Sequence, residues 1–397
     1  MNVRAVEPSF WSELSEELED LKEKSLYRAP STVLSRQGAR LKLGKRYFLN
    51  FSSNNYLGLA THPRVIRKAS EAAKTWGTSS GASRLISGNF AVHENLEKRL
   101  ARFKKEEAAV LFSSGYLANL GAMTALLGEK DLVLIDRLNH ASLIDAARLS
   151  RAKLWVYPHR DLFTLKGLLE RSRGRFRRRL VATDAYFSMD GDVAPLGKIS
   201  ELCRREEALL MVDEAHSTGV FGKEGRGLSE HFGLEGQIDV VMGTLSKSLG
   251  SVGGYIAGKK VLRNYLVNRS REFIYTTGPS PSASAAAAEA ISVIEASPLL
   301  RKKLWDNVNF LRGKFWELGY DLMGSEGPII PTLIRDTKKV LRVQDFLKAE
   351  GILAPAIRPP TVPHGTDRIR FSVMATHTRE DLVRLSLAMK KIKEKIL

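Results

Sequence analysis

Cysteine is almost absent from this sequence, because Cys203 is the only one among 397 residues. A single cysteine excludes an internal disulfide and any metal cluster built on cysteine, and it fits a reducing compartment. The sequence also has no run of about 18 apolar residues, which predicts no transmembrane helix. Residues 1–27 are acidic and amphipathic and lack the apolar core of a secretory signal. We therefore expect a cytoplasmic protein that does not enter a membrane.

Two common site motifs are missing or out of place. The eight histidines are scattered and no H-E-x-x-H occurs, so we expect no metal site. Residues 77–81, GTSSG, match the nucleophile elbow of serine hydrolases. That motif needs a strand before it, and the preceding residues have a helical pattern instead. The sequence therefore disfavours a serine hydrolase.

Acidic residues are too few to balance the basic ones, and the formal net charge is +18. Residues 171–180, RSRGRFRRRL, hold six arginines, which is typical of nucleic-acid binding or of a solvated helix end. The stretch has one aromatic residue, Phe176, and no recognisable nucleic-acid module surrounds it. We expect no nucleic-acid partner. The charge is also compatible with an acidic substrate, such as a coenzyme A thioester or an acyl carrier protein.

Strand and helix patterns alternate from about residue 108. Seven apolar segments have strand character: AAVLFSS, DLVLID, KLWVYP, RLVATDAYF, ALLMVDEAH, DVVMGT and GGYIAG. Helix-like stretches separate most of them, which predicts an α/β fold with a mostly parallel seven-stranded sheet and helices on both faces. Strands this apolar are typical of a sheet that is buried on both sides.

The two ends of the chain have a different character. Trp11, Leu14, Leu18 and Leu21 recur at helical spacing, and long helical stretches with shorter strands follow residue 290. We expect three parts: an N-terminal helix and small strand segment (1–50), a large α/β domain (51–290) and a smaller C-terminal α+β domain (291–397).

A lysine stands among small residues in DVVMGTLSKSLGSVGG, residues 239–254. The segment is not a P-loop, because Val241 and Ser246 occupy the positions of the two required glycines. Lys247 could be an ordinary loop lysine. It could also be a nucleophile, since a partly desolvated lysine loses its proton more easily and can form a Schiff base.

Other polar residues follow the predicted strands, where ligands bind in open parallel sheets. They are Ser113, Ser114, Gly115 and Tyr116 before a helix, then His140, Asp184, Ser188, Asp213, His216 and Thr244. Pyridoxal 5′-phosphate (PLP) needs a lysine for its aldehyde, a carboxylate for its ring nitrogen and an anion site for its phosphate. The sequence supplies all three in compatible places.

The motifs together resemble those of the α-oxoamine synthases, which are fold-type I PLP enzymes. They are NFSSNNYLGL, ASRLISGN, DRLNHASL, FSMDGD, MVDEAHSTGVFG, GTLSKSLGSVGGY and IRPPTVP. The resemblance extends from about residue 20 to the end of the chain. It implies condensation of a small amino acid with an acyl thioester and release of carbon dioxide.

The resemblance also implies roles for the matching residues around the ring of PLP. Lys247 would hold PLP as a Schiff base and later remove the Cα proton of the amino acid, and Asp213 would pair with the ring nitrogen. His216 would hydrogen-bond to the phenolic oxygen, and His140 would stack on the ring. Ser188 would lie near the phenolic oxygen or the incoming carbonyl.

Further residues would bind the phosphate and the substrates. Ser114, Gly115, Tyr116 and Thr244 would bind phosphate, and Thr276 and Thr277 would reach the phosphate of a partner subunit, which implies a homodimer with shared sites. Arg358 would bind the amino-acid carboxylate. Arg28 and Thr361 are candidates for contacts to the acyl substrate, and Asn54 and Ser83 for lining the site.

The segment AIRPPTVPHGTDRIRFS is most similar to family members that join L-alanine to a pimeloyl thioester. Their product is 8-amino-7-oxononanoate, a biotin precursor, and the thiol carrier is coenzyme A or an acyl carrier protein. Two residues depart from the pattern: Ser246 stands where ligases of the family often have glycine, and Glu214 where many oxononanoate-forming members have aspartate. A 2-amino-3-ketobutyrate coenzyme A ligase, using glycine and acetyl-CoA, and an enzyme of mixed specificity stay open. So do a catalytically silent subunit, against which Lys247 argues, and a nucleic-acid-binding protein.

Overall fold

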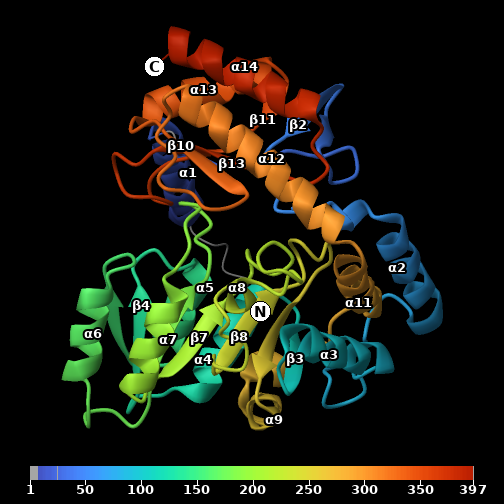
Figure 1. Ribbon diagram of the computed structural model, residues 1–397, viewed down its shortest axis with the longest axis vertical. Helices are drawn as coiled ribbons and strands as arrows, with labels where there is room; N and C mark the ends of the chain where they lie inside the picture. Colours follow the sequence, from blue (N-terminus) through green and yellow to red (C-terminus); the bar gives the residue numbers. More distant parts are fainter. Residues whose placement is uncertain (1–7, 25, 397) are drawn as a thin grey trace.

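A computed structural model describes residues 8–24 and 26–396. Residues 1–7, the start of the acidic N-terminal segment, therefore lie outside the described residues. The chain forms two layered bodies, a large one around a seven-stranded sheet and a smaller one that contains the C-terminal helix (Figure 1).

The large sheet has the strand order β3-β9-β8-β7-β6-β4-β5. Its strands are β3 (Ala108–Phe112), β4 (Leu132–Asp136), β5 (Lys153–Tyr157), β6 (Arg179–Asp184), β7 (Leu209–Asp213), β8 (Val240–Thr244) and β9 (Gly254–Gly258). The neighbours from β5 to β8 pair in parallel, and only β9 runs antiparallel to the strands beside it. The predicted α/β fold with a mostly parallel sheet is confirmed.

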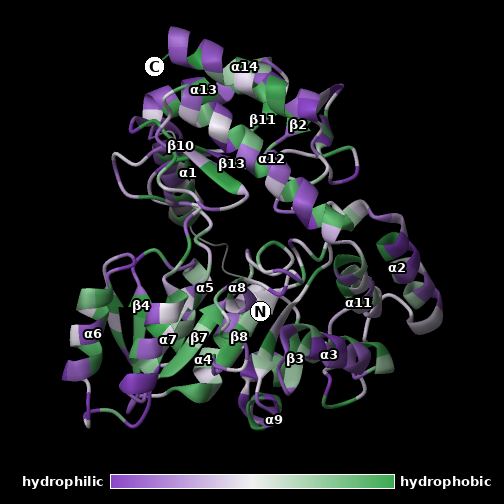
Figure 2. Ribbon diagram, viewed as in Figure 1, coloured by the Kyte–Doolittle hydropathy of each residue, from purple (hydrophilic) through white to green (hydrophobic). Residues whose placement is uncertain are grey.

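Helices cover both faces of this sheet. Successive side chains of a strand point to opposite sides, and here the side chains on both sides are apolar and need to be buried. Leu132 and Leu134 of β4 join one apolar cluster, whereas Val133 and Ile135 join another. Figure 2 shows these strands in the hydrophobic colour between helices with hydrophilic outer faces. The helices of this body are α2 (Pro63–Trp76), α3 (Ala91–Lys104), α4 (Gly115–Leu126), α5 (Ala141–Leu149), α6 (Leu162–Arg171), α7 (Leu196–Arg205), α8 (Leu228–His231), α9 (Lys260–Arg269), α10 (Arg271–Ile274) and α11 (Pro281–Ala296), with a 3-10 turn, η1 (Leu59–Thr61).

The smaller body combines both ends of the chain. Strands β10 (Ile329–Leu333), β13 (Arg368–Ser372) and β12 (Ala356–Ile357) form an antiparallel sheet, covered by α12 (Pro298–Glu317), α13 (Thr337–Ala349) and α14 (Arg379–Lys395). A second sheet joins β1 (Arg40–Leu43) and β2 (Arg46–Asn50) to β11 (Ile352–Leu353). The predicted boundaries at residues 50 and 290 stay predictions.

The predicted N-terminal helix is present as α1 (Pro8–Glu23). Its apolar residues, including Trp11 and Leu18, are exposed. Within residues 8–24 and 26–396, no single helix is long and apolar enough to cross a membrane; α11 and α12 reach that length and composition only as a pair, with a bend of 79° between them.

The arginine-rich segment lies at the amino ends of the strands, where its side chains have partners within the protein. Arg173 forms two hydrogen bonds with Glu206, at 2.6 and 2.7 Å, and Arg177 forms two with Asp131, at 2.9 and 2.6 Å. The guanidinium of Arg171 lies over the ring of Trp155. These contacts tie the segment to the start of the sheet.

Candidate active site

Polar residues from neighbouring strands meet at the carboxyl edge of the large sheet. Asp184 ends β6 and pairs in register with Asp213, which ends β7. Asp213 in turn pairs with Met242 of β8, the strand that leads through Thr244 to Lys247. The parallel arrangement therefore collects residues that are far apart in the sequence, as the strand pattern predicts.

Lys247 is half-buried beyond β8. Within the described part of the chain, no residue forms a hydrogen bond or an ion pair with its ammonium group. Burial lowers the pKa of Lys247 to about 8, although Asp213 and Asp184 oppose the change. Lys247 therefore loses its proton more easily near neutral pH than an ordinary lysine does, as a nucleophilic or basic amine requires.

Asp213 is buried, and both of its carboxylate oxygens accept hydrogen bonds. Oδ1 accepts from the backbone N–H of Ala215 at 2.8 Å, and Oδ2 accepts from the side-chain amide of Asn119 at 2.8 Å. Burial and the charge of Asp213 raise the pKa of Asp184 well above its ordinary value. Of these two acids, Asp213 therefore carries the negative charge, and its two hydrogen bonds fix the position of its carboxylate.

His216 is buried beside Tyr56, a residue that the sequence analysis missed. The phenol oxygen of Tyr56 lies 2.8 Å from Nδ1 of His216. Burial raises the pKa of Tyr56 to about 12, so the phenol keeps its proton and can donate it. Burial, together with the positive charge of Lys247, lowers the pKa of His216 well below its ordinary value. A neutral imidazole whose Nδ1 accepts from Tyr56 carries its proton on Nε2.

His140 caps the N-terminus of α5, and its backbone N–H donates to Asp184 at 2.7 Å. The residue as a whole is solvent-exposed. Partial removal from water lowers the pKa of His140; Asp213 opposes this change and Lys247 adds to it. The structure therefore places His140, Asp213 and Lys247 in one electrostatic environment.

The start of α4 packs closely against the end of β8. A Cβ atom on Gly115 would lie 2.9 Å from the Met242 side chain and 3.2 Å from Cβ of Thr244, so glycine permits this approach. Ser114 caps the helix by accepting from the backbone N–H of Leu117. Tyr116 is partly exposed and its hydroxyl donates to Asp145. Backbone N–H groups at such a helix start suit an anion.

The turn after α10 lies beside this helix start. The hydroxyl of Ser113 donates to the carbonyl of Thr277 at 3.4 Å, and Ser83 forms a β-bridge with Thr277. Thr276 is in the same turn and lines a small pocket together with Ser113. Ser83, Thr276 and Thr277 are thus neighbours of the predicted phosphate site within one chain.

Arg370 of β13 connects the two bodies, and sequence analysis missed it as well. Its Nε donates to the carbonyl of Ser188 at 2.5 Å, and its Nη2 donates to the side chain of Asn54 at 3.2 Å. Two sequence candidates are therefore held by one buried cation. Asn54 was signalled in the sequence only by its place in a motif of the resemblance, whereas Ser188 also follows a predicted strand.

The remaining candidates come from the N-terminal segment and the loop after β12. Arg28 Nη2 donates to Oγ1 of Thr361 at 3.2 Å, although 333 residues separate them. Arg358 is half-buried, and its carbonyl accepts from the backbone N–H of Thr361 at 3.0 Å. The structure thus brings Arg28, Arg358 and Thr361 into one local cluster.

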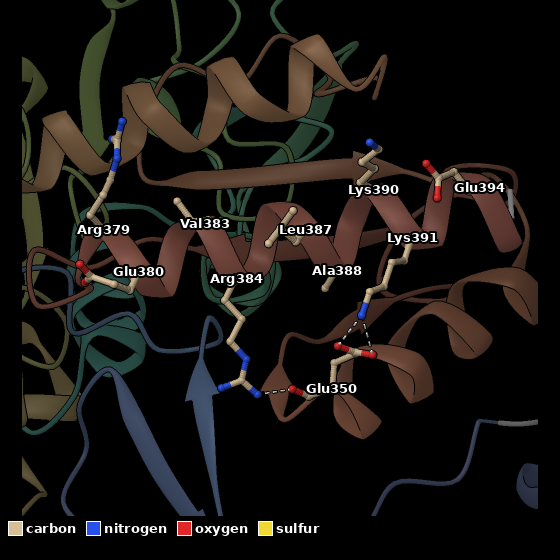
Figure 3. A pocket seen from close by; sticks show the side chains of 10 residues that line it. All are labelled: Glu350, Arg379, Glu380, Val383, Arg384, Leu387, Ala388, Lys390, Lys391 and Glu394. Atoms are coloured by element: carbon tan, nitrogen blue, oxygen red, sulfur yellow. Dashed lines mark hydrogen bonds and ion pairs between the residues drawn. The ribbon is translucent and has the colours of Figure 1, made fainter.

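A separate groove of about 670 Å³ runs along α14 on the smaller body (Figure 3). Val383 and Leu387 form its apolar part, and Lys391 and Arg384 reach from α14 to Glu350. It contains none of the residues gathered around Lys247. The groove is therefore separate from the polar edge of the large sheet.

A buried carboxylate and a lysine of lowered pKa at the carboxyl edge of such a sheet define a class of lysine-dependent α/β enzymes. The family model for aminotransferase class I and II matches residues 46–387, and the chain belongs to this family.

Relatives that cover nearly the whole chain share one name. The 8-amino-7-oxononanoate synthase of Petrotoga mobilis is 46% identical over 374 residues, which are 94% of this chain and 95% of the relative. That of Geobacter sulfurreducens is 47% identical over 378 residues, which are 95% of this chain and 96% of the relative. The resemblance to the α-oxoamine synthases is confirmed.

Solved structures agree with the fold. A structure of SPT with PLP superposes with a TM-score of 0.92 at 29% identity, covering 99% of both chains. The 8-amino-7-oxononanoate synthase of Francisella tularensis gives a TM-score of 0.77 at 26% identity, covering 88% of this chain and 99% of the other.

Proposed function

We propose that the protein is a PLP-dependent acyltransferase that joins L-alanine to a pimeloyl thioester, in the biotin pathway. The products are 8-amino-7-oxononanoate, carbon dioxide and the free thiol carrier. The observation that carries the proposal is the near full-length similarity, at 44–47% identity, to relatives named 8-amino-7-oxononanoate synthase. The geometry around Lys247 supports it independently.

The residues at the carboxyl edge fit PLP by their chemistry. Lys247 has a lowered pKa and no partner in the described chain, Asp213 is a buried carboxylate, and Gly115 permits close approach at a helix start. When bound, PLP supplies a protonated aromatic ring that withdraws electrons from the Cα atom of an amino acid. Asp213 would keep the ring nitrogen protonated, because a buried carboxylate stabilises a neighbouring cation.

The other ring contacts follow from the hydrogen bonds of each side chain. His216 would donate from Nε2 to the phenolic oxygen, since Tyr56 occupies its Nδ1. His140 would stack on the ring, and Ser188 would lie near the phenolic oxygen or the incoming carbonyl. The phosphate would be bound by Ser114, the backbone of Gly115 and Tyr116, and Thr244.

Lys247 has two tasks in the proposed reaction. Its Nζ would hold the cofactor covalently and, once alanine has taken its place, would accept the Cα proton. Cα would then form a bond to the thioester carbonyl, whose bond to sulfur would break and release the thiol carrier. A proton would replace the carboxylate on Cα when carbon dioxide leaves. Arg358 orients the alanine carboxylate through two parallel hydrogen bonds until it departs as carbon dioxide. Arg28 and Thr361 contact the acyl chain, and Asn54 and Ser83 line the site.

We further propose a cytoplasmic homodimer in which Thr276 and Thr277 reach the phosphate of the partner subunit. Their position beside Ser113 supports this proposal, because the turn lies next to the helix start. A C2 interface would place the two turns in equivalent positions. We propose coenzyme A or an acyl carrier protein as the carrier of the thioester. Subunit exchange between a Lys247 variant and a Thr276/Thr277 double variant should change activity, and a fully active monomer would contradict the idea.

Product identification tests the function. Activity with alanine plus pimeloyl-CoA is compared with activity with glycine plus acetyl-CoA, as kcat/KM on one preparation. One methyl group usually gives only about 1–3 kcal/mol of discrimination, so some glycine turnover is expected. We expect a higher kcat/KM with alanine plus pimeloyl-CoA than with glycine plus acetyl-CoA. A tenfold advantage for the glycine pair, about 1.4 kcal/mol at the transition state, would instead assign the ligase reaction.

A further inference from the structure

A chain of hydrogen bonds runs from Asp213 to His140 through two residues with no role so far. The side-chain amide of Asn119, on α4, donates to Oδ2 of Asp213 at 2.8 Å and to Oγ of Ser142 at 2.8 Å. Oγ of Ser142, on α5, lies 2.8 Å from Nδ1 of His140. Asn119 and Ser142 are both buried. The chain thus connects two helices to the ends of two different strands.

The direction of each hydrogen bond follows from the donor and acceptor capacity of the groups. A carboxylate only accepts, so the amide nitrogen of Asn119 faces Asp213. The same nitrogen has a second hydrogen, which Oγ of Ser142 accepts. The backbone N–H of Ser142 also approaches Nδ1 of His140, at 3.3 Å, and a backbone N–H only donates. Nδ1 is therefore an acceptor, and the Ser142 hydroxyl donates its proton to it.

This orientation leaves one group unsatisfied. The amide oxygen of Asn119 is buried and has no hydrogen-bond partner in the part of the chain that the structure describes. An unpaired buried acceptor costs free energy. Turning the amide over would set its oxygen against the Asp213 carboxylate, which has no proton to donate, and would leave Oδ2 of Asp213 without this donor. Both N–H groups of the Asn119 amide therefore bond within the chain of hydrogen bonds, while its oxygen is left unpaired among the described residues.

We propose that Asn119 and Ser142 are positioning residues that hold Asp213 and His140 as one unit, with the carboxylate anchored and the imidazole proton on Nε2. This inference rests on the proposed function, in which Asp213 meets the ring nitrogen and His140 stacks on the ring. The two contacts to the cofactor are then set by one rigid network and not by two independent side chains.

Charged groups on neighbouring elements also act on His140. Asp213 on β7 and Asp145 on α5 favour its protonated form, whereas Lys247 disfavours it. Asp184 accepts the backbone N–H of His140. None of these groups is altered in the variants below, so a change in the titration of His140 reports on the hydrogen-bond chain.

The first experiment replaces Ser142 by alanine in the full-length protein. A hydrogen bond to the neutral form of an imidazole lowers its pKa, so its loss should raise the pKa of His140, by about 0.5–1 pH unit. Histidine-selective ¹⁵N NMR measures the pKa and the tautomer, with the signal identified by its loss in His140→Gln. Ser150→Ala is the matched control, because Ser150 is buried on the same helix segment and bonds to Ala147.

The second experiment uses Asn119→Leu, alone and combined with Ser142→Ala. Asn119→Leu should weaken PLP binding about tenfold, since Asp213 loses a charge-assisted hydrogen bond, and should raise the pKa of His140 slightly. In the double variant the pKa of His140 should equal that of Ser142→Ala alone, because the chain is already broken. If the pKa shifts of His140 in the two single variants instead add up in the double variant, Asn119 and Ser142 act separately. That result would overturn the proposal that they hold Asp213 and His140 as one unit.

An unchanged His140 pKa and tautomer in Ser142→Ala would overturn the proposal directly. A merely structural role would lower stability in Ser142→Ala and Ser150→Ala alike without moving the titration. The NMR readout needs no substrate. If the substrate assay fails while the His140 shift appears, the proposed function is wrong and the hydrogen-bond chain stands.

Discussion

Lys104 and Lys247 lie near two adjacent acids, Glu214 and Asp213, but their environments are opposite. Lys104 of α3 is fully buried and forms an ion pair with Glu214, whose carboxylate also accepts from the backbone N–H of Ser229 at 2.7 Å. Burial alone would lower the pKa of Lys104, but Glu214 outweighs it and the pKa is raised. Lys247 has no such pair, and its pKa is about 8.

The contrast separates a lysine that stays charged from a lysine that loses its proton more easily. A lysine with a bonded carboxylate stays charged, so it cannot act as a nucleophile or a base. The two acids are neighbours in the sequence but point in different directions. Asp213 bonds to Asn119 at the carboxyl edge of the sheet, whereas Glu214 points to Lys104. Glutamate at position 214, where aspartate was the pattern of the resemblance, therefore belongs to the ion pair and not to the proposed chemistry.

The largest expected effect is the loss of turnover in Lys247→Ala. Losing a general base alone costs roughly 10²–10⁴-fold, and the covalent anchor of the cofactor is lost as well. The wild type should show a Schiff-base absorbance that borohydride removes, and this absorbance should be absent from the purified variant. Full activity of this variant would refute the proposed role of Lys247.

Lys104→Met should lower the free energy of unfolding by about 3–5 kcal/mol, because it leaves the Glu214 carboxylate buried without its cation. Denaturant titration measures the loss. The double variant Lys104→Met/Glu214→Gln should regain part of it. Turnover per folded molecule should stay close to that of the wild type, and a loss like that of Lys247→Ala would erase the distinction between the two lysines.

Glu214→Asp tests the reach of the same carboxylate. One methylene less draws the oxygens away from Lys104 and Ser229, and we expect a loss of about 1–3 kcal/mol in the free energy of unfolding. The rate with alanine and pimeloyl-CoA should not change. A change in amino-acid preference would show that residue 214 acts on the substrate after all.

The smallest effect is a pH dependence of stability in the cofactor-free protein. The pKa of Lys247 is about 8 when folded, against 10.5 ordinarily. Between these values the unfolded chain holds a proton that the folded chain has lost, so this lysine makes stability rise with pH. Lys247→Met should therefore be more stable than the wild type below pH 8, and its advantage should fade toward pH 10.5. A constant difference across this range would contradict the lowered pKa.

Local patterns were sufficient to predict the strands and the residues just beyond them. The seven apolar runs predicted the sheet, and the small residues around Lys247 predicted an unusual lysine. Asn119, Tyr56 and Arg370 were missed because their importance lies in distant partners. An asparagine inside a helix has no sequence signal for a carboxylate 94 residues away. The pairing of β2 with β11 was missed for the same reason.

That pairing has a consequence for synthesis on the ribosome. Strand β2 emerges early, but β11, which pairs with Leu49 and Asn50, follows about 300 residues later. At about 5–20 residues per second, β2 waits roughly 15–60 seconds for its partner. The large body can fold in that interval, whereas the smaller one cannot close its second sheet before the chain is nearly complete. Premature termination would leave the backbone N–H and C=O groups along this edge of β2 unpaired and open to misassembly.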